Sequence, residues 1–367
     1  MSTASPPQPK QPDGNGVWLQ NATLDQALTF FQAREVAGFV ELALHMGGVA
    51  CGLKSDWVAQ HAPAFNTLGL ADQAHNLAQE ILLALLLSPH TFSFVDLEAL
   101  ASGIRVRQFM AEAASKTALA FKTEAAERPA QFWHYEEDAG FILHAGQNLI
   151  EALISATQPE ATGKLYDFSC YRASEYVILL GLAQEAQICN LDLLTQLQRY
   201  NEVHAIRSGQ FHDVFLVEYG SMENPLPAHF YVPGDRLWFR NPHEASADVT
   251  GYEGSWVIYM GGGLFSNFWK RDQPFTLTHK CVEINHWRDG LVQAANGEWV
   301  IDEERVEACV AQTLSDPQKL TTVLQRMMRM RDPKGVYDLG GCLDTTREHP
   351  RQIHPHHCEL VLPALPI

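Results

Sequence analysis

The stretch YDFSCYRASEYVILLGLAQE, residues 166–185, decides the fold of this chain. Its apolar run at positions 176–182 is too long for a typical strand and lies between Arg172 and Gln184, which predicts a buried helix that begins near Cys170. A thiol at the start of a helix lies at the positive end of the backbone dipole, where unpaired N–H groups favour the thiolate. Cys170 is therefore a candidate nucleophile, although a lone cysteine is more often a small buried hydrophobic residue.

The region after this helix is rich in predicted strands. They lie at residues 211–219, 236–239, 256–260 and 264–268, with turns at 233–235 and 261–263. Residues 276–284 add a further expected strand, whose alternation is interrupted only by Cys281 and Val282. A helix packed on an antiparallel sheet allows a base on a strand to approach the sulfur, as in Cys/His and Cys/Glu enzymes.

Patterns typical of helices flank this region on both sides. On the N-terminal side they cover residues 23–47, 70–87, a segment from 93 onward and 148–156, and a short hairpin or loop is expected at 133–144. On the C-terminal side they cover residues 302–314 and 316–330. Residues 332–367 carry little periodicity, so we expect an irregular end.

Composition excludes several classes of partner. The 367 residues are 46% hydrophobic and 19% charged, which predicts a globular protein with a large core. Lys and Arg number 26 against 43 Asp and Glu, and the net charge of −17 repels nucleic acids and anionic lipid headgroups. The richest apolar window, residues 81–87, is far too short to cross a bilayer.

Cysteine usage and the first residues suggest a reducing compartment. The seven cysteines are odd in number, scattered and without a CxxC pair, so neither a disulfide framework nor a zinc ribbon is expected. Residues 1–16 lack the basic start and apolar run of a secretory signal. We expect a cytoplasmic protein with no cofactor, and export without a leader stays open.

Four blocks of sequence between residues 92 and 268 resemble a known family. They are a helix at 97–114 followed by QFW (131–133), YDFSC (166–170), GDRLWFRNP (234–242) and GSWVIYMG (254–261). In order and spacing these blocks are similar to the small bacterial spore-coat transglutaminases. These protein-glutamine gamma-glutamyltransferases have a papain-like, NlpC/P60-related core with a cysteine nucleophile.

The resemblance implies an α+β fold with a papain-like, transglutaminase-like core. The helix that begins at Cys170 is expected to pack on an antiparallel sheet formed by residues of about 211–285, with added helices at both ends. The expected regions are a flexible tail (1–22), an N-terminal helical extension (23–90), the transglutaminase-like catalytic core (91–290), C-terminal helices (291–335) and an irregular tail (336–367).

The chain departs from the family where the family carries its acids and its histidine. The glutamate before the cysteine is Ser169 here, and the glutamate thought to serve as general base is Ser255. The family histidine corresponds, without gaps, to the region of Asn267 and Phe268. Trp256 directly follows Ser255 and is predicted to wall the substrate channel if its strand faces the cysteine.

Three functions stay open at this point. In a transglutaminase-like transfer, Cys170 attacks a glutamine carboxamide of a protein substrate, ammonia leaves, and an amine or a lysine resolves the thioester. In a cysteine hydrolase or deamidase of the NlpC/P60 type, water resolves the same intermediate. In a non-catalytic interaction protein, the fold is kept and the reaction is lost.

The general base is expected to be one of two residues. If residues 269–275 are an insertion that lengthens the hairpin, His279 on the predicted strand is the displaced family histidine, with Glu283 on the same strand face. Without the insertion, Glu253 beside the vacated glutamate position is the next candidate. His279 is preferred because imidazole titrates near neutrality.

The segment HPRQIHPHHC, residues 349–358, carries ligand-type side chains. Three imidazoles and a thiol have the chemistry to hold zinc. Prolines between the histidines suit no rigid element, however, so a solvated tail is the preferred interpretation and no metal site is expected.

Overall fold

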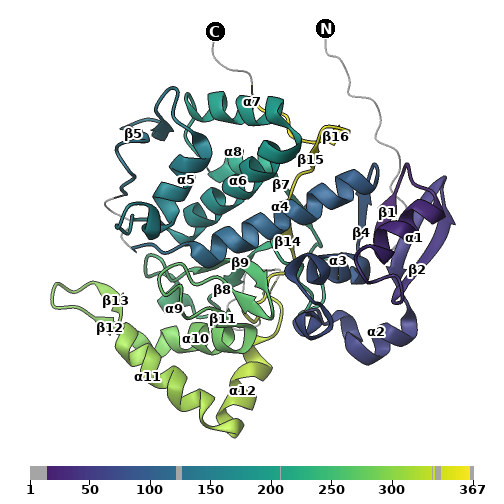
Figure 1. The fold of residues 1–367 in the computed structure, drawn as a ribbon. Coiled ribbons are helices and arrows are strands. Elements are labelled where there is room, and N and C mark those ends of the chain that lie inside the picture. The colour runs from purple at the N-terminus through teal and green to yellow at the C-terminus, as the bar shows by residue number, and fades with distance from the viewer. Residues whose placement is uncertain (1–14, 121–125, 207, 333, 335–339, 364–367) are drawn as a thin grey trace.

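The computed structural model describes residues 15–120, 126–206, 208–332, 334 and 340–363. Its centre is a six-stranded sheet with the strand order β11-β10-β9-β8-β14-β7, in which all named pairs are antiparallel. The strands are β7 (Leu216–Tyr219), β8 (Arg236–Arg240), β9 (Gly254–Gly261), β10 (Leu264–Phe265), β11 (Phe275–Thr276) and β14 (Arg347–Pro350). Figure 1 shows helices on both sides of this sheet.

The expected buried helix is confirmed as α6 (Cys170–Cys189), which packs along α4 (Leu97–Lys116). The two helices approach closely at Gly181, where an added Cβ would lie 2.5 Å from Met110 Cγ. Ile258 of β9 belongs to the same buried cluster as the apolar residues of α6. The cysteine-bearing helix therefore packs on the antiparallel sheet, and the α+β fold class is confirmed.

The opposite face of β9 is covered by the C-terminal helices α10 (Leu277–Gly290), α11 (Glu303–Leu314) and α12 (Pro317–Met327). Val257 and Tyr259 alternate with Ile258 and lie in the cluster formed with these helices. The helices predicted at 302–314 and 316–330 are confirmed. The strand predicted at 276–284 is wrong, because those residues form the first half of α10.

Residues 23–90 were expected to form a helical extension, but the structure shows both helices and strands there. Two strands of this region join one strand on either side of it in a four-stranded sheet of order β2-β3-β1-β4, with β1 (Gly16–Leu19), β2 (Val40–His45), β3 (Gly48–Leu53) and β4 (Thr91–Phe94). Its helices are α1 (Leu24–Gln32), α2 (Ser55–His61), η1 (Pro63–Phe65), η2 (Leu70–Gln73) and α3 (Leu77–Leu87). The helix predicted at 23–47 therefore ends at Gln32, and the flexible tail predicted to reach residue 22 is wrong over β1. Residues 1–14 lie outside the described part.

The remaining elements join these layers. The hairpin expected at 133–144 is confirmed as β5 (Trp133–Glu136) and β6 (Gly140–Leu143), and the helix expected at 148–156 as α5 (Leu149–Thr157). Residues 211–215, predicted as strand, belong to α8 (Ser208–Phe215). The other elements are η3 (Pro159–Ala161), α7 (Leu191–Asn201), α9 (Glu244–Ala247), β12 (Leu291–Gln293) and β13 (Trp299–Ile301).

The C-terminal segment is more ordered than the expected irregular tail. β14 lies between β8 and β7 in the central sheet, and a small hairpin follows, formed by β15 (Ile353–His354) and β16 (His357–Cys358). Residues 336–339 and 364–367 lie outside the described part. The boundaries between the expected regions stay predictions.

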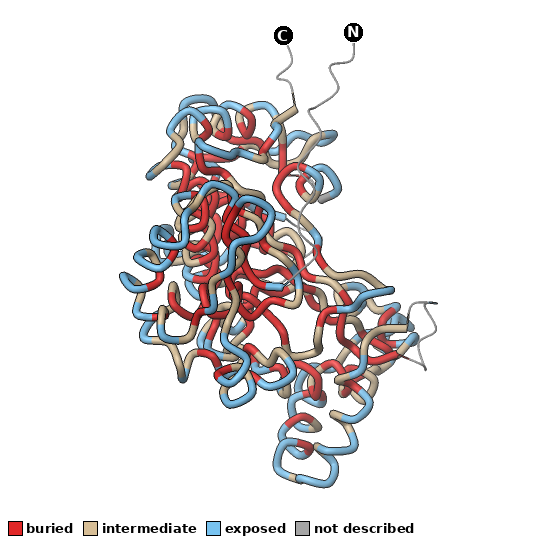
Figure 2. Tube along the Cα trace, turned by 90° about the vertical axis from the view of Figure 1, so that its right-hand side faces the viewer, coloured by how far each residue is buried: buried red, intermediate tan, exposed pale blue. Residues whose placement is uncertain are grey.

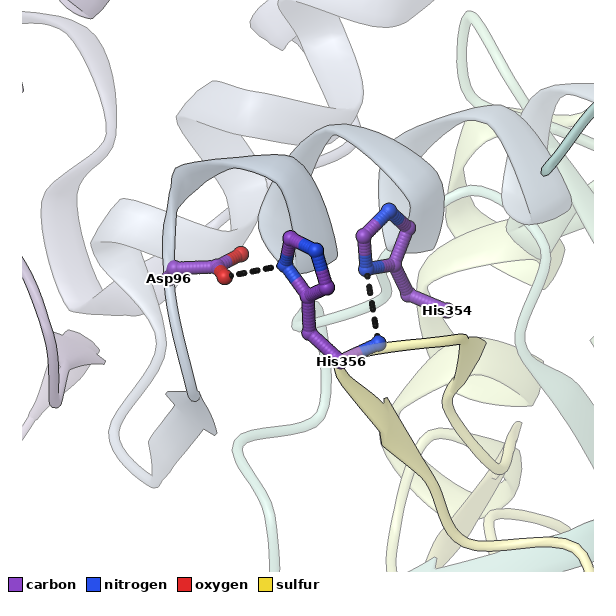
Figure 3. A group of neighbouring side chains, drawn as sticks. All are labelled: Asp96, His354 and His356. Carbon is purple, nitrogen blue, oxygen red and sulfur yellow. Dashed lines mark hydrogen bonds and ion pairs between the residues drawn. The ribbon is translucent and has the colours of Figure 1, made fainter.

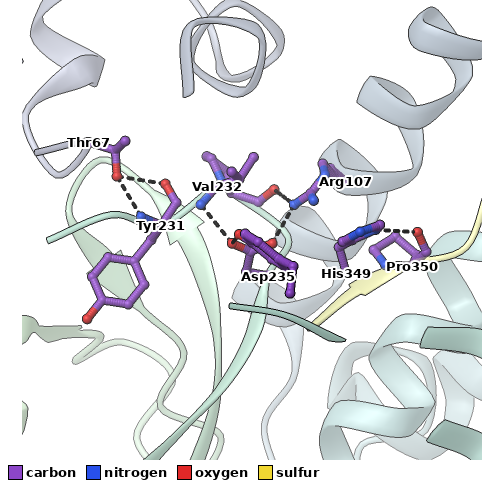
Figure 4. A network of polar contacts seen from close by, with 9 residues as sticks. Thr67, Arg107, Tyr231, Val232, Asp235, His349 and Pro350 are labelled. Carbon is purple, nitrogen blue, oxygen red and sulfur yellow. Dashed lines mark hydrogen bonds and ion pairs between the residues drawn. The ribbon is translucent and has the colours of Figure 1, made fainter. Parts of the chain in front are cut away.

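Buried residues concentrate in the interior, and exposed residues follow the outer loops and helices (Figure 2). A polar network connects the two halves of this interior around Asp235, which is fully buried (Figure 4). The Asp235 carboxylate accepts hydrogen bonds from the Arg107 guanidinium at 2.7 Å, the Val232 N–H at 2.9 Å and the Tyr219 hydroxyl. The Gly-Asp motif at 234–235 therefore has a structural role, since it fastens α4 to the start of β8.

Candidate active site

Cys170 is the first residue of α6, and Ser169 is its N-cap. The Ser169 hydroxyl accepts a hydrogen bond from the Arg172 N–H at 3.3 Å, which satisfies one of the unpaired donors at the helix end. The serine that stands where the spore-coat enzymes carry glutamate thus fixes the start of the helix. Cys170 is half-buried.

Several groups surround the Cys170 sulfur. Burial raises the pKa of the thiol and outweighs the groups that lower it, which are the Trp256 N–H, the positive charge of Lys280 and the N–H groups of Tyr171 and Cys170. The thiolate expected at the helix N-terminus is therefore not the favoured form, since desolvation dominates. Groups on α6, β9 and α10 nevertheless each lower the pKa of the thiol and so favour a negative charge on the sulfur.

Lys280 is the charged side chain that the sequence analysis missed. It is 2% exposed, its ammonium is 2.8 Å from Glu283, and it lies 3.6 Å from the centre of the Phe275 ring. The pair with Glu283 spans three residues of α10, so it depends on the helical conformation that the sequence analysis did not predict. If the segment had been predicted as a helix with its apolar residues 277, 281 and 284 facing the sheet, residue 280 would have been predicted on the same side.

His279 and Glu253 are both exposed. The His279 N–H donates to the Thr276 hydroxyl at 3.1 Å, and its ring lies 5.7 Å from that of Phe275. Glu253 accepts a hydrogen bond from the Gly251 N–H at 3.1 Å. Within the described ranges, neither side chain makes a hydrogen bond or ion pair with the Cys170 sulfur. The shared strand face predicted for His279 and Glu283 is wrong, because both residues lie on a helix.

Trp256 lies beside the candidate nucleophile. Its ring makes an edge-to-face contact with Tyr171 at 4.9 Å and stacks on Trp238 at 6.2 Å, and the Arg236 guanidinium lies 4.8 Å from its centre. The same residue directs its backbone N–H at the sulfur. The aromatic wall predicted at this position is compatible with the geometry, and its contact with substrate stays a prediction.

Comparison with known proteins identifies the family. Residues 59–352 match the family described as protein-glutamine gamma-glutamyltransferase. The chain belongs to this transglutaminase family. The transglutaminase from Geobacillus stearothermophilus, without its C-terminal extension, is a similar solved structure, with 20% sequence identity and a TM-score of 0.38 over 52% of this chain and 85% of that one. No curated protein matches the chain.

The resemblance inferred from the sequence blocks is thereby confirmed. Within the part of the chain that the structure describes, no helix is long and apolar enough to cross a membrane. The expected cytoplasmic location stays a prediction.

The positions where related transglutaminases carry glutamate and histidine hold other groups here. Ser255 is buried on the face of β9 that packs on α10, the helix that carries Lys280. The Asn267 side chain donates to the Gln273 carbonyl at 2.9 Å and closes a turn, and Phe268 is part of the core. Lys280 therefore belongs to the element that packs on the face where the glutamate would project.

A cavity of about 400 Å³ lies at the head of α6. Its lining includes Ser169, Asp167 and Arg172 on one side and the β5–β6 hairpin on the other. Asp167 is buried, and one of its carboxylate oxygens has no hydrogen-bond partner among the described residues. The chain thus has a polar space directly next to the residue that precedes its candidate nucleophile.

The raised pKa of the Cys170 thiol makes its reactivity depend on pH. We expect the rate of iodoacetamide labelling at Cys170 to keep rising above about pH 9, where an ordinary thiol is already mostly ionised. Lys280→Met should move this rise to higher pH, because it removes a charge that favours the thiolate. Peptide mapping by mass spectrometry measures the rates, with the partly exposed Cys309 in the same digest as reference. Identical profiles for Cys170 in both proteins would contradict the role of Lys280.

Proposed function

We propose that this chain catalyses acyl transfer on glutamine side chains of protein substrates, with Cys170 as the nucleophile and an amine or a lysine as the acceptor. The observation that carries the proposal is the place of Cys170 at the N-terminus of α6, with the Trp256 N–H directed at its sulfur and the Lys280 charge acting on it from the helix that covers the opposite face of β9. A cysteine that serves only as a small core residue has no need of such groups. Family membership supports the same chemistry.

The reaction proceeds in two steps. The sulfur attacks the glutamine carboxamide carbon, the C–N bond breaks, and the nitrogen leaves as ammonia after it takes up the thiol proton. A primary amine then attacks the thioester, an isopeptide bond forms, and the proton lost by the amine returns to the sulfur. Lys280 stabilises the thiolate at the start and end of this cycle.

Proton transfer in this scheme is assigned to a few candidates. His279 and Glu253 are the bases suggested by the sequence, and they are tested as His279→Ala and Glu253→Gln. Lys280 is added because its charge acts on the sulfur. Substrate entry is assigned to the Trp256 side of Cys170 and to the cavity beside Ser169.

The test measures both products of the reaction. Glutamine-containing proteins and peptides are incubated with the enzyme and a fluorescent primary amine, and released ammonia and incorporated amine are quantified together. We expect both products from the native chain and neither from Cys170→Ala. Cys189→Ala, at the other end of the same helix, is the matched control and should keep both activities.

The other outcomes separate the alternatives. Ammonia without amine incorporation would identify a deamidase or hydrolase, in which water resolves the thioester. Neither product, over a range of protein and peptide substrates, would identify an interaction protein that keeps the fold. Activity that survives in Cys170→Ala would overturn the assignment of the nucleophile.

A further inference from the structure

Three side chains with metal-binding chemistry meet where the C-terminal hairpin contacts the start of α4 (Figure 3). They are Asp96, the N-cap of α4, His354 at the end of β15, and His356 in the turn before β16. One potential ligand atom from each lies within 4.8 Å of the other two. The contact joins segments that are separated by more than 250 positions in the chain.

Local hydrogen bonds hold one nitrogen of each imidazole, and His354 Nδ1 accepts a hydrogen bond from the His356 backbone N–H at 3.4 Å. One oxygen of Asp96 caps the helix by accepting from the Ala99 N–H at 2.8 Å, and the other oxygen lies 2.6 Å from His356 Nδ1. His354 is buried, and its ring centre lies 4.5 Å from that of His356, edge to face. Figure 3 shows the His354 and His356 rings side by side, with Asp96 on the far side of His356.

We propose that Asp96, His354 and His356 bind a zinc ion that fastens the C-terminal hairpin to α4. Two imidazoles and a carboxylate are a suitable donor set for Zn²⁺, which accepts three protein ligands and leaves the fourth tetrahedral position to water. Zn²⁺ takes the place of the proton between His356 Nδ1 and the Asp96 oxygen, and the neutral ring then carries its one proton on Nε2.

The main physical objection is the positive end of the α4 dipole, which disfavours a cation. The Asp96 carboxylate stands between the helix end and His356, and Glu98 adds a negative charge in the first turn. The net charge of −17 also favours cations in general. The electrostatic surroundings therefore support a divalent ion in spite of the dipole.

A second group of ligand-type residues provides a comparison. His286, Asp289 and Cys309 also lie within 4.8 Å of one another. There, however, both imidazole nitrogens are already bonded, to Asp289 at 2.6 Å and to the Thr313 hydroxyl at 2.8 Å. Zinc would have to displace a bond at whichever nitrogen of His286 it used, whereas the hydrogen bonds described for His354 and His356 involve Nδ1 of each ring and not Nε2, so the group at Asp96 is the better site.

The zinc site changes the interpretation of the histidine-rich segment. Sequence analysis favoured a solvated tail without metal, but His354 is buried, and the hairpin that carries it packs on α4 and α6. Residues 354 and 356 lie just beyond the part matched by the transglutaminase family, 59–352. The proposed ion is therefore an addition to the family core and is independent of the reaction at Cys170.

The test uses the full chain without a histidine tag, stripped with a chelator and titrated with ZnCl2 by calorimetry and elemental analysis. We expect saturation at about one equivalent in the native chain. Asp96→Asn, His354→Gln and His356→Gln should each weaken binding by about tenfold or more. Asparagine is also a good N-cap, so Asp96→Asn tests the ligand while it keeps the helix end. His357→Gln, Cys358→Ser and Cys309→Ser are matched controls that should bind like the native chain.

Two further measurements separate this site from adventitious binding. Co²⁺ in place of Zn²⁺ should give visible d–d bands without thiolate charge transfer, because no cysteine is a ligand. Zn²⁺ should slow proteolysis of the segment after residue 350 in the native chain and not in His356→Gln. Binding that is absent, that is lost in Cys358→Ser or Cys309→Ser, or that leaves proteolysis unchanged would overturn the proposal.

Discussion

Replacing Arg107 by methionine should lower the free energy of unfolding by about 3–5 kcal/mol. The Asp235 carboxylate is fully buried, and Arg107 is the cation in contact with it, at 2.7 Å and itself only 4% exposed. Removal of the guanidinium leaves a charge in the interior with only the Tyr219 hydroxyl and the Val232 N–H as partners. The cost is the desolvation of an uncompensated carboxylate, which is larger than the value of an ordinary ion pair.

Urea unfolding followed by circular dichroism measures this change. Lys164→Met is the matched control, because Lys164 pairs with Glu127 at the surface, where both side chains are about half exposed. The control should change stability by less than about 1 kcal/mol. An Arg107→Met protein as stable as Lys164→Met would show that the Asp235 network does not hold α4 to the sheet.

The second large effect concerns acid stability and His349. Burial and the nearby Arg107 charge lower the pKa of His349 to about 3, and its ring packs against Phe92 and Tyr219. The unfolded chain takes up a proton on this residue near pH 6.5, whereas the folded protein resists protonation until about pH 3. The stabilisation is therefore fully present above about pH 6.5 and is lost as the pH falls toward 3.

The stability lost through His349 reaches about 2–4 kcal/mol at the acid end of this range, which is less than the full pKa shift would give because part of the residue's surface stays exposed. Urea unfolding of the native chain and of His349→Gln, at several values between about pH 4 and pH 8, isolates it from the carboxylates that both proteins share. The difference in unfolding free energy between the two proteins should shrink as the pH falls. A difference that is constant with pH would rule out His349 as an acid-sensitive residue.

The elements predicted correctly are those in which local pattern and tertiary burial agree. The apolar run at 176–182 is too long for a typical strand, and α6 is buried on every face over these residues. The GDRLWFRNP block placed β8 and its turn, and the structure shows why: Asp235 is a buried acceptor, and Asn241 bonds Ser246 and the Tyr252 carbonyl to shape the following loop.

One element that was not predicted is a strand in which polar residues are buried. β14 contains Arg347 and Glu348, which looked like a solvated tail, yet both are buried. Glu348 pairs with Arg236 of β8 and with His212 of α8, at 2.5 Å and 2.6 Å. Hydrophobic periodicity cannot detect a strand that is stabilised by paired charges from distant segments.

The candidate site was predictable only in part. Cys170 and Trp256 lie together as the sequence blocks implied, because each is placed by its own local element. The β-branched residues of 276–284 suggested a strand, whereas the Thr276 cap and the apolar spacing made a helix. Because the segment is a helix, the side chain that faces the sheet is Lys280 and not the predicted His279.

The position of β14 also determines when the protein can fold. The strands β7 and β8 are not adjacent in the sheet, because Arg347–Pro350 from near the end of the chain fills the place between them. On the ribosome, both strands emerge more than a hundred residues before their common neighbour, so each exposes an unpaired edge while the rest of the chain is made. Completion of the sheet therefore waits until residues 347–350 have left the ribosome, and a nascent chain that stalls before residue 347 is a natural substrate for chaperones.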